Sequence, residues 1–167
     1  MSREQRTKRL ILIIHNVRSA HNVGALFRTA DGAGVERIFL SGYTPAPAIQ
    51  GTSYLTKAEK ALIKTALGAE QTIAWERVKS FSSVAERLHK EAFDIVALEQ
   101  TENSIYYEEY STKKNSALVV GNEVKGIDKS ILKQCDAIIE LPMYGKKNSL
   151  NVSVAGGIAL YFLSRIM

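Results

Sequence analysis

The chain has 167 residues, of which 46% are hydrophobic, and a formal net charge of +5. This length and composition predict one domain that buries about 70% of the surface of the unfolded chain. No apolar run reaches the roughly 18 residues of a membrane span, and residues 1–9 lack the apolar core of a signal peptide, so we expect a cytoplasmic protein without a membrane partner. The single cysteine, Cys135, excludes an internal disulfide and a cysteine-based metal cluster. The positive charge permits an anionic partner but does not establish one.

Short β-rich runs alternate with helical ones along the chain. Strands are predicted at residues 10–15, 37–41, 71–77, 94–99, 117–121 and 137–141, and helices at 23–33, 57–67, 82–91, 128–134 and 150–167. The strands are not separated by hairpin dipeptides, so the alternation predicts an α/β fold, a single-domain, mostly parallel sheet of about six strands with helices on both faces. Residues 1–9 are predicted to be a basic N-terminal tail, in which Arg3, Arg6, Lys8 and Arg9 form either a solvated surface or an anion contact. The domain is then expected to cover residues 10–167.

The C-terminal part of the chain places a polar loop between a strand and a helix. The loop covers residues 142–149, and either Ser149 or Asn151 can cap the helix that follows. Open α/β sheets bind ligands beyond the carboxyl ends of their strands, where free helix N–H groups point outward. The loop is therefore predicted to bind a ligand, and Lys146 and Lys147 within it are candidates for phosphate contacts.

Two earlier segments place polar residues at strand-to-helix or strand-to-loop junctions. In NVRSAHNVGALFRTADGAGV, Asn22 could simply cap a helix, and Arg28 could be paired structurally or bind a carboxylate or phosphate. In VVGNEVKGID, Gly121 ends a strand and lets a ligand approach the backbone, and Asn122 and Glu123 follow it. By composition alone, this second segment is also an ordinary exit from a strand.

These two segments and the C-terminal LPMYGKKNSLNVSVAGGIALY resemble, in order, the three motifs of the SpoU (TrmH-type) family of RNA ribose 2′-O-methyltransferases, in the SPOUT class. Three ordered motifs across most of the chain are far more specific than one glycine-bearing loop. The resemblance implies a deep trefoil knot at the C-terminus, S-adenosylmethionine as the cofactor, tRNA or rRNA as the substrate, and a homodimer. Catalysis should need no metal, because this cofactor supplies an activated electrophile.

The resemblance also assigns roles to residues in the three motifs. The implied catalytic residues are Arg28, Asn22, Glu123, Ser149 and Asn151. The implied cofactor contacts are Leu98, Gly121, Asn122, Leu141, Met143, Ser149 and Leu150. RNA contacts are predicted at Arg18, His21, Arg28, Lys146 and Lys147. The candidates for the dimer interface are Tyr161, Phe162 and Ile166.

A neutral ribose hydroxyl is a poor nucleophile, so the site must help to remove its proton or stabilise the developing alkoxide. Arg28 could accept the proton if it were strongly desolvated, or it could hold an RNA phosphate while that phosphate or solvent takes the proton. We favour the second route, because it uses the fork geometry of a charged guanidinium.

Three alternatives to this activity remain at the level of the sequence. They are a SPOUT-type RNA base methyltransferase, a non-catalytic RNA-binding protein of the same fold, and a dinucleotide-binding oxidoreductase. The last is disfavoured because NVRSAHNVG holds one glycine where a G-x-G-x-x-G turn is expected.

Overall fold

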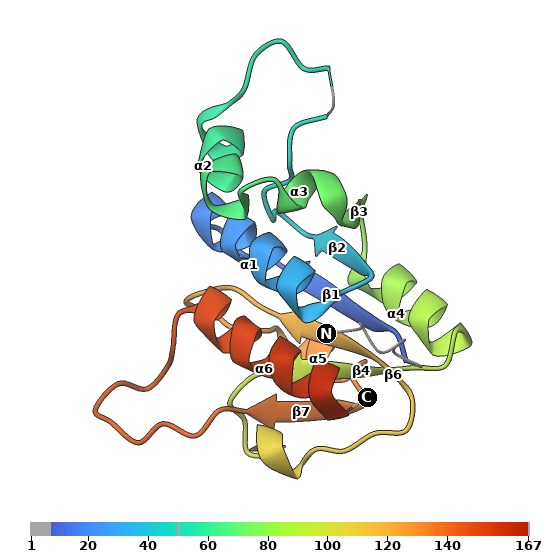
Figure 1. Ribbon diagram of the computed structural model, residues 1–167. Helices are drawn as coiled ribbons and strands as arrows, with labels where there is room; N and C mark the ends of the chain where they lie inside the picture. Colours follow the sequence, from blue (N-terminus) through green and yellow to red (C-terminus); the bar gives the residue numbers. More distant parts are fainter. Residues whose placement is uncertain (1–7, 50, 167) are drawn as a thin grey trace, which may run out of the picture.

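The computed structural model describes residues 8–49 and 51–166, and its ribbon is drawn in Figure 1. Arg3 and Arg6 of the predicted tail and Met167 of the predicted last helix lie outside the described residues. Seven strands form one sheet in the order β3-β2-β1-β6-β4-β7-β5. Every strand pairing in it is parallel, so the predicted α/β fold is confirmed. The strand order is consistent with the knot that the resemblance implies.

The elements follow the predicted alternation closely. The strands are β1 (Leu10–His15), β2 (Arg37–Ser41), β3 (Ala74–Val78), β4 (Phe93–Leu98), β5 (Ile105–Tyr106), β6 (Asn115–Val120) and β7 (Ala137–Glu140). The helices are α1 (Ala20–Ala33), α2 (Lys57–Ala66), α3 (Ala69–Thr72), α4 (Phe81–Lys90), α5 (Lys129–Leu132) and α6 (Val152–Ile166), with the 3-10 turn η1 (Tyr107–Glu109). Among these residues, no helix is both long enough and apolar enough to cross a membrane.

Among the differences from the prediction, two boundaries and one missed strand have identifiable reasons. Helix α1 begins three residues early, because the Ser19 side chain, rather than that of Asn22, caps it by accepting a hydrogen bond from the Asn22 N–H. The predicted strand at 71–77 is wrong at its start, where Gln71 and Thr72 belong to the short helix α3. The sequence also gave no sign of β5, because its two residues are both exposed and too few to alternate.

The alternation of side chains along the strands divides the core into two layers. Leu10, Leu12 and Ile14 of β1 pack in the layer that includes buried residues of α1, α2, α3 and α6. Ile11 and Ile13 point to the opposite face and pack with buried residues of α4 and with Ile131 of α5. Both faces of the sheet are therefore covered, which explains why β1 is buried at every position.

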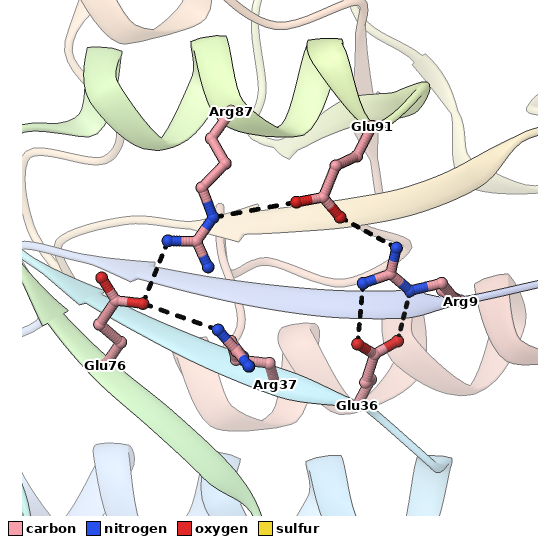
Figure 2. Close-up of polar contacts among 6 residues, drawn as sticks. All are labelled: Arg9, Glu36, Arg37, Glu76, Arg87 and Glu91. Carbon is pink, nitrogen blue, oxygen red and sulfur yellow. Dashed lines mark hydrogen bonds and ion pairs between the residues drawn. The ribbon is translucent and has the colours of Figure 1, made fainter.

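An ion-pair network ties α4 to the strands at one end of the sheet (Figure 2). Arg9 donates two hydrogen bonds to Glu36, at 2.6 and 2.9 Å, and a third to Glu91 of α4 at 2.9 Å. The bonds to Glu36 and then to Glu91 raise the pKa of the Arg9 guanidinium. Lys8 donates to the carbonyl of Thr112. The described end of the basic tail is therefore bound to the domain, and Arg9 in particular is paired rather than free for an anion.

A second arginine extends this network from α4 to the edge strand. Arg87 lies 3.2 Å from the carboxylate of Glu76 in β3 and 3.9 Å from that of Glu91, and its guanidinium stacks 4.9 Å from the centre of the Phe39 ring. We expect Arg87→Ala to lower the free energy of unfolding by about 1 kcal/mol, because it removes two partly exposed ion pairs and a cation–π contact. Urea unfolding measures this loss, and about 1 M salt should reduce the difference in free energy of unfolding between Arg87→Ala and the wild type.

Lys90→Ala is the matched control, since Lys90 is exposed on the same helix and makes no ion pair within the described part of the chain. An equal loss in the Lys90 and Arg87 variants would contradict a role for the network.

Candidate cofactor cleft and active site

A cleft opens where β4, β6 and β7 end and the loops after them converge. All seven residues predicted to contact a cofactor line it, namely Leu98, Gly121, Asn122, Leu141, Met143, Ser149 and Leu150. Its walls also include Val120, Val152 and Ala155, and its empty volume is about 800 Å³ with the open mouth included. The cleft is open to solvent and lined by both apolar and polar residues at the carboxyl ends of parallel strands, which is where open α/β sheets bind small ligands.

Gly121 is required in this cleft by packing of the chain on itself. A side chain at this position would place its Cβ 2.5 Å from Cγ1 of Ile127 and 2.8 Å from the backbone of Gly126. The sequence suggested that a ligand approaches the backbone here. The structure gives a different reason for the glycine, which is the close return of residues 126–127 over the end of β6.

Asn122 has no hydrogen-bonding capacity left for a cofactor. Its Nδ2 donates to the Asn16 carbonyl and to the Tyr43 hydroxyl, both at 3.0 Å, and its Oδ1 accepts from the N–H groups of Val124 and Lys125. A side-chain amide offers two donors and one carbonyl acceptor with two lone pairs, so all are used. Its amide therefore holds three loops together. Asn122 still lines the cleft, and its contact with a cofactor stays a prediction.

Asn16 anchors the loop after β1 on which Asn122 depends. It adopts a left-handed backbone conformation with φ of 55°. Its Oδ1 accepts from the Tyr43 N–H, and its Nδ2 lies 3.0 Å from Nε2 of the buried His15. His15 in turn contacts Ser41 through Nδ1 at 2.6 Å, and burial lowers its pKa. These residues give the loops after β1, β2 and β6 one fixed arrangement.

Glu123, Asn22 and Asn151 form a hydrogen-bonded chain across all three sequence motifs. Glu123 accepts from the N–H groups of Arg18 and Ser19, both at 2.9 Å, and from Asn22 Nδ2 at 3.0 Å. Asn22 Oδ1 accepts from Asn151 Nδ2 at 3.1 Å. The two bonded pairs span 101 and 129 positions of the chain, and both meet at Asn22 beside the cleft.

Asn151 also fixes the start of α6. Its Oδ1 accepts from the Ser153 N–H at 2.8 Å and from the Ser153 hydroxyl at 2.6 Å. Of the two caps that the sequence allowed, Asn151 is therefore the one used. Ser149 lies on the wall of the cleft and is exposed.

The surroundings of Glu123 favour its ionised form. Burial alone would raise its pKa, but hydrogen bonds from the backbone of Arg18 and Ser19 and from Asn22 outweigh burial and lower it. The stabilisation from these bonds is present above the ordinary glutamate pKa of about 4.5 and is lost as the pH falls through the lower folded value. We expect Glu123→Gln to lower the free energy of unfolding by about 1 kcal/mol at pH 7, a value kept small because Glu123 is exposed. The loss should become progressively smaller below about pH 4.

Urea unfolding between pH 3 and 7 measures this difference. Glu86→Gln, on the exposed surface of α4, is the control and should show no comparable dependence. A pH-independent difference between Glu123→Gln and the wild type would contradict the assignment.

The predicted RNA-contacting residues are spread around the cleft rather than inside it. Arg28 is exposed on α1 and borders a separate groove, whose other walls include Lys64 and Thr65 of α2 and Tyr161 of α6. Arg18 lines a shallow hollow beside Asn22 and Glu123. The remaining candidates, His21, Lys146 and Lys147, are exposed. A single chain therefore does not bring Arg28 into the cleft.

Two carboxylates in the cleft were missed by sequence reasoning. Glu99 follows β4 and accepts from the N–H groups of Ile127 at 2.8 Å and Gln100 at 2.9 Å. Glu140 ends β7 and accepts from the Ser104 hydroxyl. Both are polar residues at the carboxyl end of a strand, which was the signal available for them. In the described chain, no group of three or more His, Cys, Asp or Glu side chains could hold a metal ion.

Residues 9–161 match the family described as the SpoU rRNA Methylase family. The chain is 34% identical to a tRNA (guanosine(18)-2′-O)-methyltransferase of Aquifex aeolicus, over 97% of this chain and 72% of the relative. It is 32% identical to the 23S rRNA (guanosine(2553)-2′-O)-methyltransferase RlmP of Bacillus subtilis, over 94% of this chain and 58% of the relative. The structure of an AdoMet-bound rRNA methyltransferase from Sinorhizobium meliloti superposes with a TM-score of 0.83 at 25% identity, covering 94% of this chain and 56% of that one. The chain thus spans little more than half the length of the last two proteins.

Proposed function

Because the chain belongs to the SpoU rRNA Methylase family, we propose that it transfers a methyl group from S-adenosylmethionine to a ribose 2′-hydroxyl of tRNA or rRNA. The observation that carries this proposal is the hydrogen-bonded chain of Glu123, Asn22 and Asn151 beside the cleft at the carboxyl ends of β4, β6 and β7. The relatives reported above are named 2′-O-methyltransferases, which favours the ribose over a base as the acceptor. A cytoplasmic location stays a prediction.

When bound, the cofactor would supply an activated methyl group on a positively charged sulfur for transfer to the ribose oxygen. The hydroxyl proton then leaves to an RNA phosphate or to solvent. Glu123 already accepts three hydrogen bonds, so we assign it to holding Asn22 and the start of α1 rather than to removing this proton. Asn22 has one amide hydrogen and one lone pair free to orient the ribose.

Incubation with labelled S-adenosylmethionine and total tRNA or rRNA from an undermodified host, followed by nucleoside mass spectrometry, tests the activity. We expect label in a 2′-O-methylnucleoside. Label on a base would replace the ribose assignment with base methylation. Cofactor binding without any transfer to either RNA would favour the non-catalytic RNA-binding alternative.

We further propose that the protein acts as a homodimer through an exposed apolar face of α6. Val154, Ile158 and Tyr161 are 51%, 40% and 54% exposed and recur at helical spacing. Two of the predicted interface residues do not belong to this face. Phe162 packs edge-on against Tyr107, with 5.1 Å between ring centres, and Ile166 packs on the core. Tyr161 also borders the groove that holds Arg28, so a second copy seated here would lie next to Arg28.

A charge in the middle of this face should separate the subunits. We expect Ile158→Glu to sediment as a folded monomer at micromolar concentration, because the dimer would bury an unpaired carboxylate at its interface. Methyl transfer should fall at least about tenfold, because the monomer lacks the partner subunit next to Arg28. Glu102→Lys is a control for changes in surface charge, since Glu102 is exposed in the turn after β4. A wild-type protein that is monomeric and fully active at this concentration would contradict the dimer.

Complementation tests whether each site draws on both subunits. Mixed dimers of Arg28→Ala and Asn151→Ala should recover part of the activity that each variant lacks alone, because one of the two sites then has both residues intact. Activity no higher than that of the separate variants would place both residues in the same subunit's site.

A further inference from the structure

The cofactor cleft is acidic although the chain as a whole is basic. Three glutamates line it, Glu99, Glu123 and Glu140, whereas the net charge of the chain is +5. The residues that line this cleft, all from the described part of the chain, include no lysine, arginine or histidine. The nearby Lys146 and Lys147 are exposed on the loop and do not line it. The interior of the cleft therefore carries the opposite charge to that expected for a surface that binds RNA phosphates.

Each of the three carboxylates is held in place by neighbours that leave its charge uncompensated by a cation. Glu99 accepts from two backbone N–H groups and Glu140 from a serine hydroxyl. Glu123 accepts from two backbone N–H groups and an amide. These donors are neutral, and no ion pair to any of the three is present among the residues that the structure describes. A cationic ligand in the cleft would therefore meet fixed negative charge.

The two forms of the cofactor differ by one charge. S-adenosylmethionine carries a positive sulfonium, and the thioether product S-adenosylhomocysteine is neutral at the same atom. The two are otherwise nearly the same in shape, so contacts to adenine, ribose and the amino-acid tail do not distinguish them. Both ligands keep the same zwitterionic amino-acid tail, so the Coulombic attraction that differs between them is the attraction to the sulfonium, and it is stronger in a partly enclosed cleft than in bulk water.

Resting on the function proposed above, we propose that Glu99 and Glu140 are specificity-determining residues that make the cleft bind the sulfonium cofactor in preference to the thioether product. When the methyl group is transferred, the cofactor loses its positive charge, so the cleft attracts the remaining product less strongly. This difference favours release of the product and binding of new S-adenosylmethionine. RNA contacts are expected elsewhere, on the basic residues outside the cleft, so the two ligands rely on surfaces of opposite charge.

Isothermal titration of the full chain with S-adenosylmethionine, S-adenosylhomocysteine and sinefungin tests this proposal. Sinefungin replaces the methylated sulfur by a carbon that bears a charged amine, and it should behave as the sulfonium form does. Glu140→Gln is the principal variant, because the glutamine oxygen can still accept from Ser104. Glu99→Gln is the second variant, and Glu102→Gln, exposed and outside the cleft, is the matched control for charge.

We expect the ratio of the Kd of the product to that of S-adenosylmethionine to fall by about threefold to tenfold in Glu140→Gln, in the same direction in Glu99→Gln, and not in Glu102→Gln. About 0.5 M salt should lower the wild-type ratio as well. An unchanged ratio in variants that still bind both ligands, or an equal loss of affinity for both, would overturn the proposal. A wild-type chain that binds none of the three ligands would instead remove the proposed function, and this inference with it.

Discussion

Arg28→Ala is expected to slow methyl transfer on the order of 10²-fold or more, with the affinity for S-adenosylmethionine nearly unchanged. Arg28 is exposed on α1 and does not line the cofactor cleft, so its removal leaves the cofactor contacts intact. Its guanidinium forms no ion pair within residues 8–49 and 51–166, so the fold does not depend on it. Single-turnover transfer at saturating RNA, together with cofactor titration, measures the two quantities separately.

Arg28→Lys should recover only a small part of the loss, because a point charge cannot reproduce a bidentate contact with phosphate. Arg165→Ala is the matched control, since Arg165 is exposed near the end of α6 and outside both the cleft and the groove of Arg28. Near-normal turnover by Arg28→Ala at saturating RNA would remove Arg28 from the chemistry.

The second large effect concerns Gly24, on the side of α1 that packs against α2. A Cβ at this position would lie 2.2 Å from the Leu62 carbonyl oxygen and 2.2 Å from the Thr65 hydroxyl, and 3.0 Å from the Ala66 nitrogen. Two of these atoms are backbone and cannot rotate away, so the helices would have to separate. We expect Gly24→Ala to lower the free energy of unfolding by about 3 kcal/mol, at the upper end for overpacking, despite the better helix propensity of alanine.

Gly145→Ala is the control for this substitution, because a Cβ there meets no atom within 4 Å. Urea unfolding of both variants should give a large loss for Gly24→Ala and almost none for Gly145→Ala. A Gly24 variant as stable as the wild type would mean that α1 and α2 pack less closely than described.

Most elements could be predicted from the sequence because buried residues recur at the spacing of the strand or helix that contains them. The apolar runs at residues 10–15 and 37–41 became β1 and β2 with the predicted bounds. Helix caps were harder, because Ser19 and Asn22 are both good caps within four residues and only the backbone path decides between them. Side-chain pairing was beyond reach for a physical reason. Asn122 is satisfied by Asn16 and Tyr43, which lie 106 and 79 positions away, and only the folded sheet brings them together.

The candidate site likewise has a part that the sequence predicted and a part that it did not. The residues predicted for the cofactor do line one cleft, since the carboxyl ends of parallel strands meet at one edge of a sheet. Arg28 lies apart from them, because six positions along a helix carry a side chain well over a turn away from Asn22, an offset that a motif read in one dimension does not convey.

The two walls of the cleft differ in how far hydrogen bonds preorganise them in the absence of a ligand. On one side, hydrogen bonds of Asn16, Asn122 and Glu123 hold the loops in one arrangement. On the other side, residues 144–150 are exposed throughout, and no hydrogen bond of theirs is found within the described structure. A ligand that closes this second wall must restrict its backbone and side chains, at about 1–2 kcal/mol of conformational entropy for each residue fixed. Binding of a ligand in the cleft should therefore be driven by enthalpy and opposed by entropy. Most of the unfavourable entropy should come from ordering residues 144–150.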